Sequence, residues 1–221
     1  MVTSRQRILA VVLAAAVVFS VPRAAEAGPP LLCHPFDAGS SPVLPWGAGN
    51  GWNSTDRSYD VQRLTADTLR LLSADTPILA RMENLRRATL YASQNRRVAD
   101  ELLKAMLARA TAPSGSAANR LALFDAGYLI ESYRQASHIY HWNMLSGSER
   151  SSWAIRQEPE GLDGYAMVKK ALEAGANPEM EFAASLMKEG AVSAEHRRRA
   201  QAGATAGSLL ATNLRKFADL K

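Results

Sequence analysis

The sequence predicts an all-α fold, a stack of antiparallel helical hairpins with about seven helices, preceded by an extended segment. Three observations predict it. From Ser58 onward, apolar residues recur every three or four positions, the period of an amphipathic helix. No stretch alternates apolar and polar residues with the period of two that marks a strand. Between Gly28 and Trp52, proline and glycine are too frequent for a helix.

The N-terminal residues have the composition of an export signal. Two arginines within residues 1–7 precede an almost wholly apolar stretch, Ile8 to Val21, and Ala25-Glu26-Ala27 places small residues where a signal peptidase reads them. The apolar stretch is shorter than the ~20 residues that span a bilayer. We therefore expect residues 1–27 to be a cleavable signal peptide, with cleavage near Ala27/Gly28. The mature protein would be periplasmic or extracellular, without a permanent membrane span.

The next stretch, "GPPLLCHPFDAGSSPVLPWGAGNGW", opens an extended lead segment that we assign to residues 28–57. It is too apolar for a free tail. We expect it to lie across the helices and to bury six apolar side chains: Leu31, Leu32, Phe36, Leu44, Trp46 and Trp52.

Residues 58–221 are expected to form a single helical domain. The predicted helices cover residues 58–73, 76–92, about 98–107, about 119–141, 162–174, 178–189 and 193 to about 218. The fourth is apolar nearly all round between Leu121 and Ile130, which predicts a central position. Residues 143–161 are polar and aperiodic, which indicates a long loop, either a functional flap or a mobile segment.

Composition excludes some classes of protein. The formal net charge is +5, and the basic clusters Arg86-Arg87, Arg96-Arg97 and Arg197-Arg198-Arg199 fall on separate helices, as expected for solvent-exposed helix faces. A nucleic-acid binder gathers such residues into one stripe, so no nucleic-acid partner is expected. Cys33 is the only cysteine, so no internal disulfide can form and stability must come from packing.

Two stretches of the C-terminal part are similar to each other, and we call this similarity the sequence echo. "KKALEAGANPEMEFAASL" (Lys169 to Leu186), shifted by 28 positions, aligns with "RRRAQAGATAGSLLATNL" (Arg197 to Leu214). These pieces resemble Sel1-like and tetratricopeptide helical hairpins, in which small residues let neighbouring helices pack closely. The resemblance implies architecture only.

A second resemblance covers the mature chain. The segments "LLCHPF", "LPWG", "FDAGYLIESYRQ" and "DGYAMVKKAL" are similar to uncharacterised exported bacterial helical proteins. The resemblance implies an exported protein of bacterial type and implies no activity.

His138 and His141 are candidate metal ligands. They are three residues apart and share a helix face with Glu131, which gives a possible two-histidine, one-carboxylate site. The stretch "ASHIYHW" is equally natural as an aromatic helix end with histidines near the C-terminal dipole.

Glu131 is also the candidate catalytic residue. The Glu131-Ser132 pair in "YLIESYRQAS" resembles that of lytic transglycosylases, a family that uses one glutamate as acid and base on peptidoglycan. The Gly-Leu-Met-Gln segment of that family is missing here. The alternative is a glutamate that pairs with Arg134 along the helix surface.

Cys33 has several possible roles. Lipidation of Cys33 would need a small residue in place of Leu32. Binding of one metal ion by Cys33 and His34 is disfavoured because an extended chain points adjacent side chains to opposite sides. A nucleophilic Cys33 would need a base such as His138 or His141. The alternative is a small buried hydrophobic residue.

The sequence contains no complete catalytic motif and no phosphate-binding glycine loop. We therefore predict an exported, non-enzymatic scaffold that needs no cofactor and binds another protein or a cell-envelope component. The alternative is a hydrolase or lyase of envelope glycan or peptide that uses Glu131 with His138 and His141. A plain stabilising protein without a ligand is a third possibility.

Overall fold

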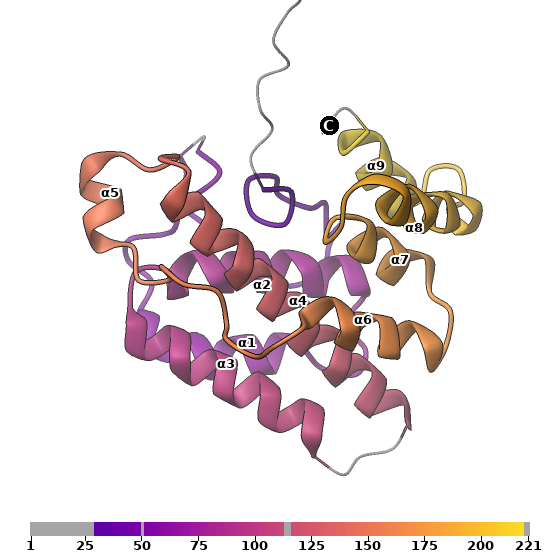
Figure 1. Ribbon diagram of the computed structural model, residues 1–221, viewed down its shortest axis with the longest axis horizontal. Helices are drawn as coiled ribbons and strands as arrows, with labels where there is room; N and C mark the ends of the chain where they lie inside the picture. The colour runs from indigo at the N-terminus through magenta and orange to yellow at the C-terminus, as the bar shows by residue number, and fades with distance from the viewer. Residues whose placement is uncertain (1–28, 50, 113–115, 219–221) are drawn as a thin grey trace, which may run out of the picture.

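A computed structural model describes residues 29–49, 51–112 and 116–218, so the predicted signal peptide 1–27 lies outside the described residues. Within these ranges the chain is all-helical, with nine α-helices and one 3-10 helix and no strand. The all-α prediction is confirmed (Figure 1). There are two more α-helices than expected, for reasons given below.

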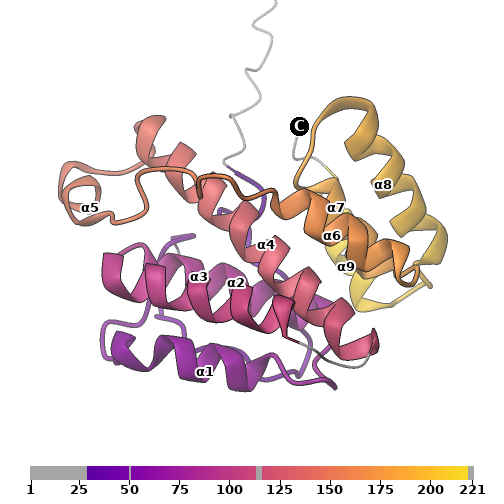
Figure 2. The same cartoon turned by 60° about the horizontal axis from the view of Figure 1, so that its bottom comes forward.

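The N-terminal half forms a layered stack (Figure 2). In chain order it contains η1 (Val61–Arg63), α1 (Leu64–Leu71), α2 (Ile78–Ala92), α3 (Arg96–Thr111) and α4 (Ser116–His141). Consecutive helices contact each other from α1 through α4, and α2 also contacts α4. Helix α3 begins where Asn95 caps it, with Oδ1 accepting from Val98 N at 3.3 Å.

The first additional helix, α5 (Gly147–Ser152), lies inside the predicted loop 143–161. It begins at a capping box in which Ser146 and Glu149 bond each other's backbone. The loop then returns to the helices through Trp153, whose Nε1 donates to the Ala136 carbonyl at 3.1 Å and whose side chain is buried. The predicted loop 143–161 therefore contains one short helix.

The C-terminal part contains α6 (Gly164–Glu173), α7 (Pro178–Ser185), α8 (Gly190–Gly203) and α9 (Leu209–Lys216). The predicted last helix, 193–218, is two helices because the chain turns at Gly207, which has φ +78°, and restarts at Ser208, which caps α9. Both halves of the sequence echo contain a helix end, a turn and a new helix start.

Helix α4 is central, as predicted, since it contacts α2, α3 and α6. It approaches α6 closely at Gly127, where an added Cβ would lie 2.5 Å from the carbonyl oxygen of Gly164 in α6. Two glycines facing each other let these backbones touch. The crossing fixes where the C-terminal half of α4 lies relative to α6, and this half of α4 lines the groove described below.

Helix α2 is buried on nearly every side, which the sequence did not predict. Its Arg86 is 1% exposed, so the assignment of Arg86-Arg87 to a solvent-exposed face was wrong, whereas Arg96 and Arg97 are exposed as expected. Arg86 and Arg87 both bond Glu83, with distances of 2.8 and 2.6 Å. These charges are buried because the lead segment covers the face that would otherwise meet water.

The lead segment crosses the helices and buries Leu31, Leu32, Phe36 and Leu44, as predicted. Trp46 and Trp52 are only partly buried. Polar side chains of the helices accept bonds from its backbone amides. Phe36 N donates to Glu83 Oε2 at 2.9 Å, Leu44 N to Asn84 Oδ1 at 2.8 Å and Leu31 N to Gln135 Oε1 at 2.8 Å.

The lead segment also contacts the last helix. Asp37 N donates to Asn213 Oδ1 and Asn213 Nδ2 donates to the Asp37 carbonyl, both at 2.9 Å. The rings of Phe36 and Phe217 stack with their centres 4.9 Å apart. Residues from the two ends of the described chain therefore share one part of the core.

Candidate functional site

A groove of about 700 Å³ lies between the C-terminal half of α4 and the connection from α7 to α8, with the start of the lead segment at one side. Its volume is that of a pocket for one small ligand. From α4 it is lined by Glu131, Arg134, Gln135 and His138, and Trp142 lines it directly after the helix end. The other wall includes Leu186, Met187, Lys188, Glu189, Ala194 and Arg197, with Pro29 and Pro30 beside it.

Trp142 lines the groove and is 61% exposed, the largest exposure of any large apolar side chain in the described part of the chain. It follows the last residue of α4, and its ring stacks on His138 with centres 5.1 Å apart. An indole held in a fixed orientation and open to water provides an apolar surface for a ligand.

Most neutral polar side chains of the groove already bond the protein itself. Gln135 accepts from Leu31 N and donates to the Leu186 carbonyl at 3.3 Å. The hydroxyls of Ser185 and Ser193 donate to the carbonyls of Phe182 and Ser185. The groove therefore offers a ligand apolar surface and charge rather than a dense set of hydrogen-bonding groups.

Glu131 lines this groove but its carboxylate is held by the protein. It is 3% exposed. Arg134 Nη1 donates to its two oxygens at 2.7 and 2.8 Å, and the backbone N–H of Tyr165 donates to Oε1 at 2.9 Å. The predicted Glu131–Arg134 pair is present, although it is largely buried rather than on the surface. Through its bond from Tyr165 N, the Glu131 carboxylate joins α4 to the first turn of α6.

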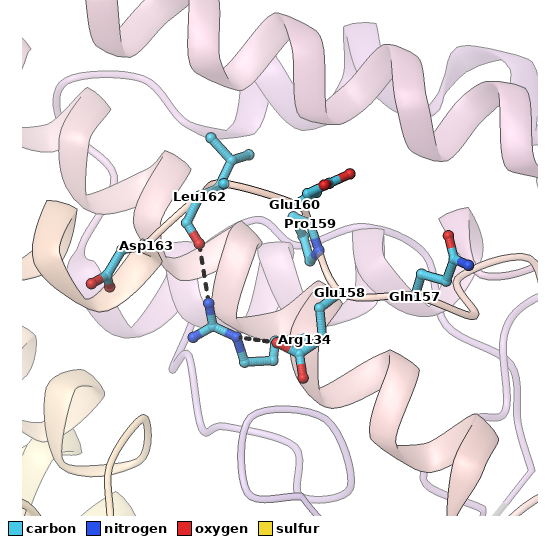
Figure 3. A pocket seen from close by; sticks show the side chains of 8 residues that line it. Arg134, Gln157, Glu158, Pro159, Glu160, Leu162 and Asp163 are labelled. Carbon is cyan, nitrogen blue, oxygen red and sulfur yellow. Dashed lines mark hydrogen bonds and ion pairs between the residues drawn. The ribbon is translucent and has the colours of Figure 1, made fainter.

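Arg134 is bonded through all three guanidinium nitrogens. Nε donates to Glu158 at 3.0 Å and Nη2 to the Leu162 carbonyl at 3.1 Å, the two bonds drawn in Figure 3. Together with residues 157–163 it lines a second, open hollow of about 600 Å³. Arg134 therefore borders both cavities and holds the segment that crosses α4.

His138 and His141 bond different partners. His138 Nε2 lies 2.9 Å from Glu158 Oε1, and this bond is the main reason that the pKa of Glu158 is lowered. His141 Nε2 lies 2.9 Å from the Arg156 carbonyl oxygen. His138 lines the groove, and His141 does not. Among the described residues, no group of three or more His, Cys, Asp or Glu side chains is arranged to hold a metal ion.

Cys33 lies on the lead segment and does not line the groove. Burial raises the pKa of its thiol to about 12, and the nearby Arg86 charge only partly opposes this. Because the thiolate is the nucleophile, a raised pKa disfavours nucleophilic chemistry. The structure therefore brings Glu131 and His138 to the groove and leaves His141 and Cys33 outside it.

Of the lining residues, only Glu131 and His138 were predicted as site residues, and the ones missed include Trp142, Lys188 and Arg197. Trp142 is part of the aromatic helix end noted in the sequence, which was the one available signal. Lys188 and Arg197 are indistinguishable in sequence from ordinary surface cations, because their convergence depends on the turn between α7 and α8.

A second polar cluster joins three helices away from the groove. His196 Nδ1 lies 2.5 Å from Glu181 Oε2, and His196 Nε2 lies 2.8 Å from the Tyr165 hydroxyl. Glu181 and His196 are buried. The chain of bonds fastens α8 to α7 and α6, and residues of α7 and α8 belong to the second wall of the groove.

Comparison with protein-family models, curated proteins and solved structures gives no match for this chain. None of the helices in the described ranges combines the length and the apolar character needed to cross a bilayer.

Proposed function

We propose that this protein is an exported, non-enzymatic helical protein that binds a component of the cell envelope in the groove between α4 and the α7–α8 connection. One observation carries the proposal: a cavity of about 700 Å³ with the 61% exposed ring of Trp142 beside it. Large apolar side chains that remain exposed beside a concave surface are typical of binding sites.

The sequence supports the cellular setting of the proposal. The composition of residues 1–27 is that of an export signal, and the echo between 169–186 and 197–214 is similar to helical-hairpin scaffolds that bind partners in a concave surface. A role as an exported binding scaffold agrees with both the composition of residues 1–27 and the sequence echo.

The contacts of Glu131 favour binding over the alternative of a hydrolase or lyase. A general acid must reach its substrate, and here both carboxylate oxygens bond Arg134 while one also bonds Tyr165 N. His141, the proposed partner in that alternative, lies outside the groove lining.

The proposal is tested with a neutral apolar fluorophore, N-phenyl-1-naphthylamine. We expect saturable binding at one site, weakened by Trp142→Ala. Val192→Ala is the matched control, because Val192 is 47% exposed and does not line the groove. Absence of saturable binding, or equal loss in both variants, would contradict the proposal. Release of fragments from peptidoglycan that disappears in Glu131→Gln would favour the enzyme instead.

A further inference from the structure

We infer that the ligand of the groove is a single-chain anionic amphiphile, a molecule with one acyl-type chain and a carboxylate or phosphate head. This inference rests on the proposed function and names the class of ligand for the same groove. It follows from the charges that the protein leaves unpaired there and from the apolar character of the remaining lining.

Two cations line the groove without a carboxylate partner. Among the described residues, neither Lys188 nor Arg197 forms an ion pair. Lys188 Nζ lies 4.5 Å from the centre of the Tyr165 ring, and Arg197 Nη1 donates to the Phe217 carbonyl at 3.0 Å. Both side chains are partly buried, where a charge interacts with an anion more strongly than it would in open water.

The other charges of the groove do not neutralise these two. Arg134 and Glu131 bond each other. Glu189 is exposed at the turn into α8 and is the one further acid in the lining. Among the described residues from 186 onward, the basic side chains outnumber the acidic ones even though Arg198 and Arg199 pair with Glu195: they are Lys188, Arg197, Arg198, Arg199, Arg215 and Lys216 against Glu189 and Glu195. The field on this side of the groove attracts an anion.

The rest of the lining suits an acyl chain. The groove has apolar lining groups on both sides, from Trp142 on one side and Leu186, Met187, Pro29 and Pro30 on the other. Because Gln135, Ser185 and Ser193 already bond the protein, a sugar would find few partners for its hydroxyls. An acyl chain needs no such partners. Apolar surface beside two unpaired cations therefore selects an amphipathic anion over a glycan.

The experiment measures displacement of N-phenyl-1-naphthylamine from the purified protein by four probes below their micelle-forming concentrations. Dodecanoate and lysophosphatidylglycerol carry an anionic head, lysophosphatidylcholine a zwitterionic head and dodecan-1-ol none. We expect both anionic probes to bind about tenfold more tightly than the other two. The ratio between the two anionic probes distinguishes a fatty acid from a phospholipid-derived source.

The double variant Lys188→Gln/Arg197→Gln should weaken binding of dodecanoate about tenfold and leave the affinity for the neutral fluorophore unchanged. Lys169→Gln/Lys170→Gln is the matched control, because it removes the same charge from exposed positions of α6 outside the groove. A further test uses the wild-type protein alone and varies the ionic strength. The affinity for dodecanoate should fall as ionic strength rises, whereas the affinity for dodecan-1-ol should not fall.

Several outcomes overturn the inference and leave the proposed function intact. Equal affinity for dodecanoate and dodecan-1-ol removes the role of the two cations. Displacement by an acidic peptide but by none of the amphiphiles points to a protein partner. Sedimentation with phosphatidylglycerol vesicles without binding of the monomeric probes points to a membrane surface. Failure of the fluorophore itself to bind contradicts the proposed function as well.

Discussion

Gly127 and Gly164 bring the backbones of α4 and α6 into direct contact. A Cβ at Gly127 would meet the Gly164 carbonyl oxygen at 2.5 Å and the side chains of Met167 and Val168 at 3.0 Å. Backbone atoms cannot move aside as a flexible side chain can. The α4–α6 crossing, which sets the position of Glu131 against Tyr165, therefore requires glycine at this position.

Gly127→Ala should lower the free energy of unfolding by about 1–3 kcal/mol, because the added methyl group forces the two helices apart. Denaturant unfolding followed by circular dichroism measures the change. Gly164→Ala should have a similar effect. Gly147→Ala is the control, since Gly147 is also the first residue of a helix and has no atom within 4 Å of an added Cβ. A neutral Gly127→Ala would show that the helices can separate at little cost.

Glu83→Gln should destabilise the protein by about 3 kcal/mol, because it leaves the charge of Arg86 buried without its carboxylate. It also weakens the acceptor for Phe36 N on the lead segment. Urea unfolding gives the value. Glu101→Gln removes a carboxylate whose partner, Arg97, is 69% exposed, and should stay within about 0.5 kcal/mol of wild type. Equal effects of the two substitutions would argue against the buried cluster.

Because the pKa of Glu83 is lowered in the folded protein, the free energy of unfolding should depend on pH. Burial raises the pKa of Glu83, but the hydrogen bonds and charges of Arg86 and Arg87 together outweigh burial and lower it below 4.5. The unfolded chain therefore binds this proton more readily than the folded protein does. The stabilisation is fully present above pH 4.5 and is lost as pH falls through the lower folded value.

Unfolding measured between pH 6 and pH 3 should show that the wild-type protein loses its advantage over Glu83→Gln below pH 4.5. The difference between the two proteins isolates Glu83, because all other carboxyl groups are common to both. A difference that stayed constant down to pH 3 would mean that the pKa of Glu83 is not lowered.

Cys33 should react slowly with thiol reagents in the folded protein. A pKa raised from 9.0 to about 12 reduces the thiolate fraction roughly a thousandfold. Iodoacetamide labelling at pH 8, followed by mass spectrometry, should be slow in buffer and fast in concentrated guanidinium chloride. Rapid labelling in buffer would show that the lead segment does not bury this thiol.

Much of the fold could be predicted from the sequence because helix-forming signals are local. The spacing of apolar residues placed the helices, and their beginnings carry local caps, such as Asn177, whose side chain accepts from Met180 N. The break before α9 was missed because small residues on both sides of Gly207 continue the helical pattern. Helix α5 was missed because its residues are polar and its position depends on the distant contact of Trp153 with Ala136.

The site was predicted only in part because its residues come from separate elements. Glu131 and His138 were found through their spacing on one helix. The burial of Glu83 and Arg86 was missed because a charged residue on a helix is expected to face water. The groove cations Lys188 and Arg197 were missed because nothing local shows that a turn brings them to α4.

The contact between Phe36 and Phe217 has a consequence for how the chain folds. The two rings stack 4.9 Å apart although they come from opposite ends of the described chain. Most helical proteins fold quickly because their contacts are local, whereas a contact of this span closes a very long loop. During synthesis the lead segment emerges long before α9. Its place in the core cannot be completed until α9 and Phe217 have been synthesised.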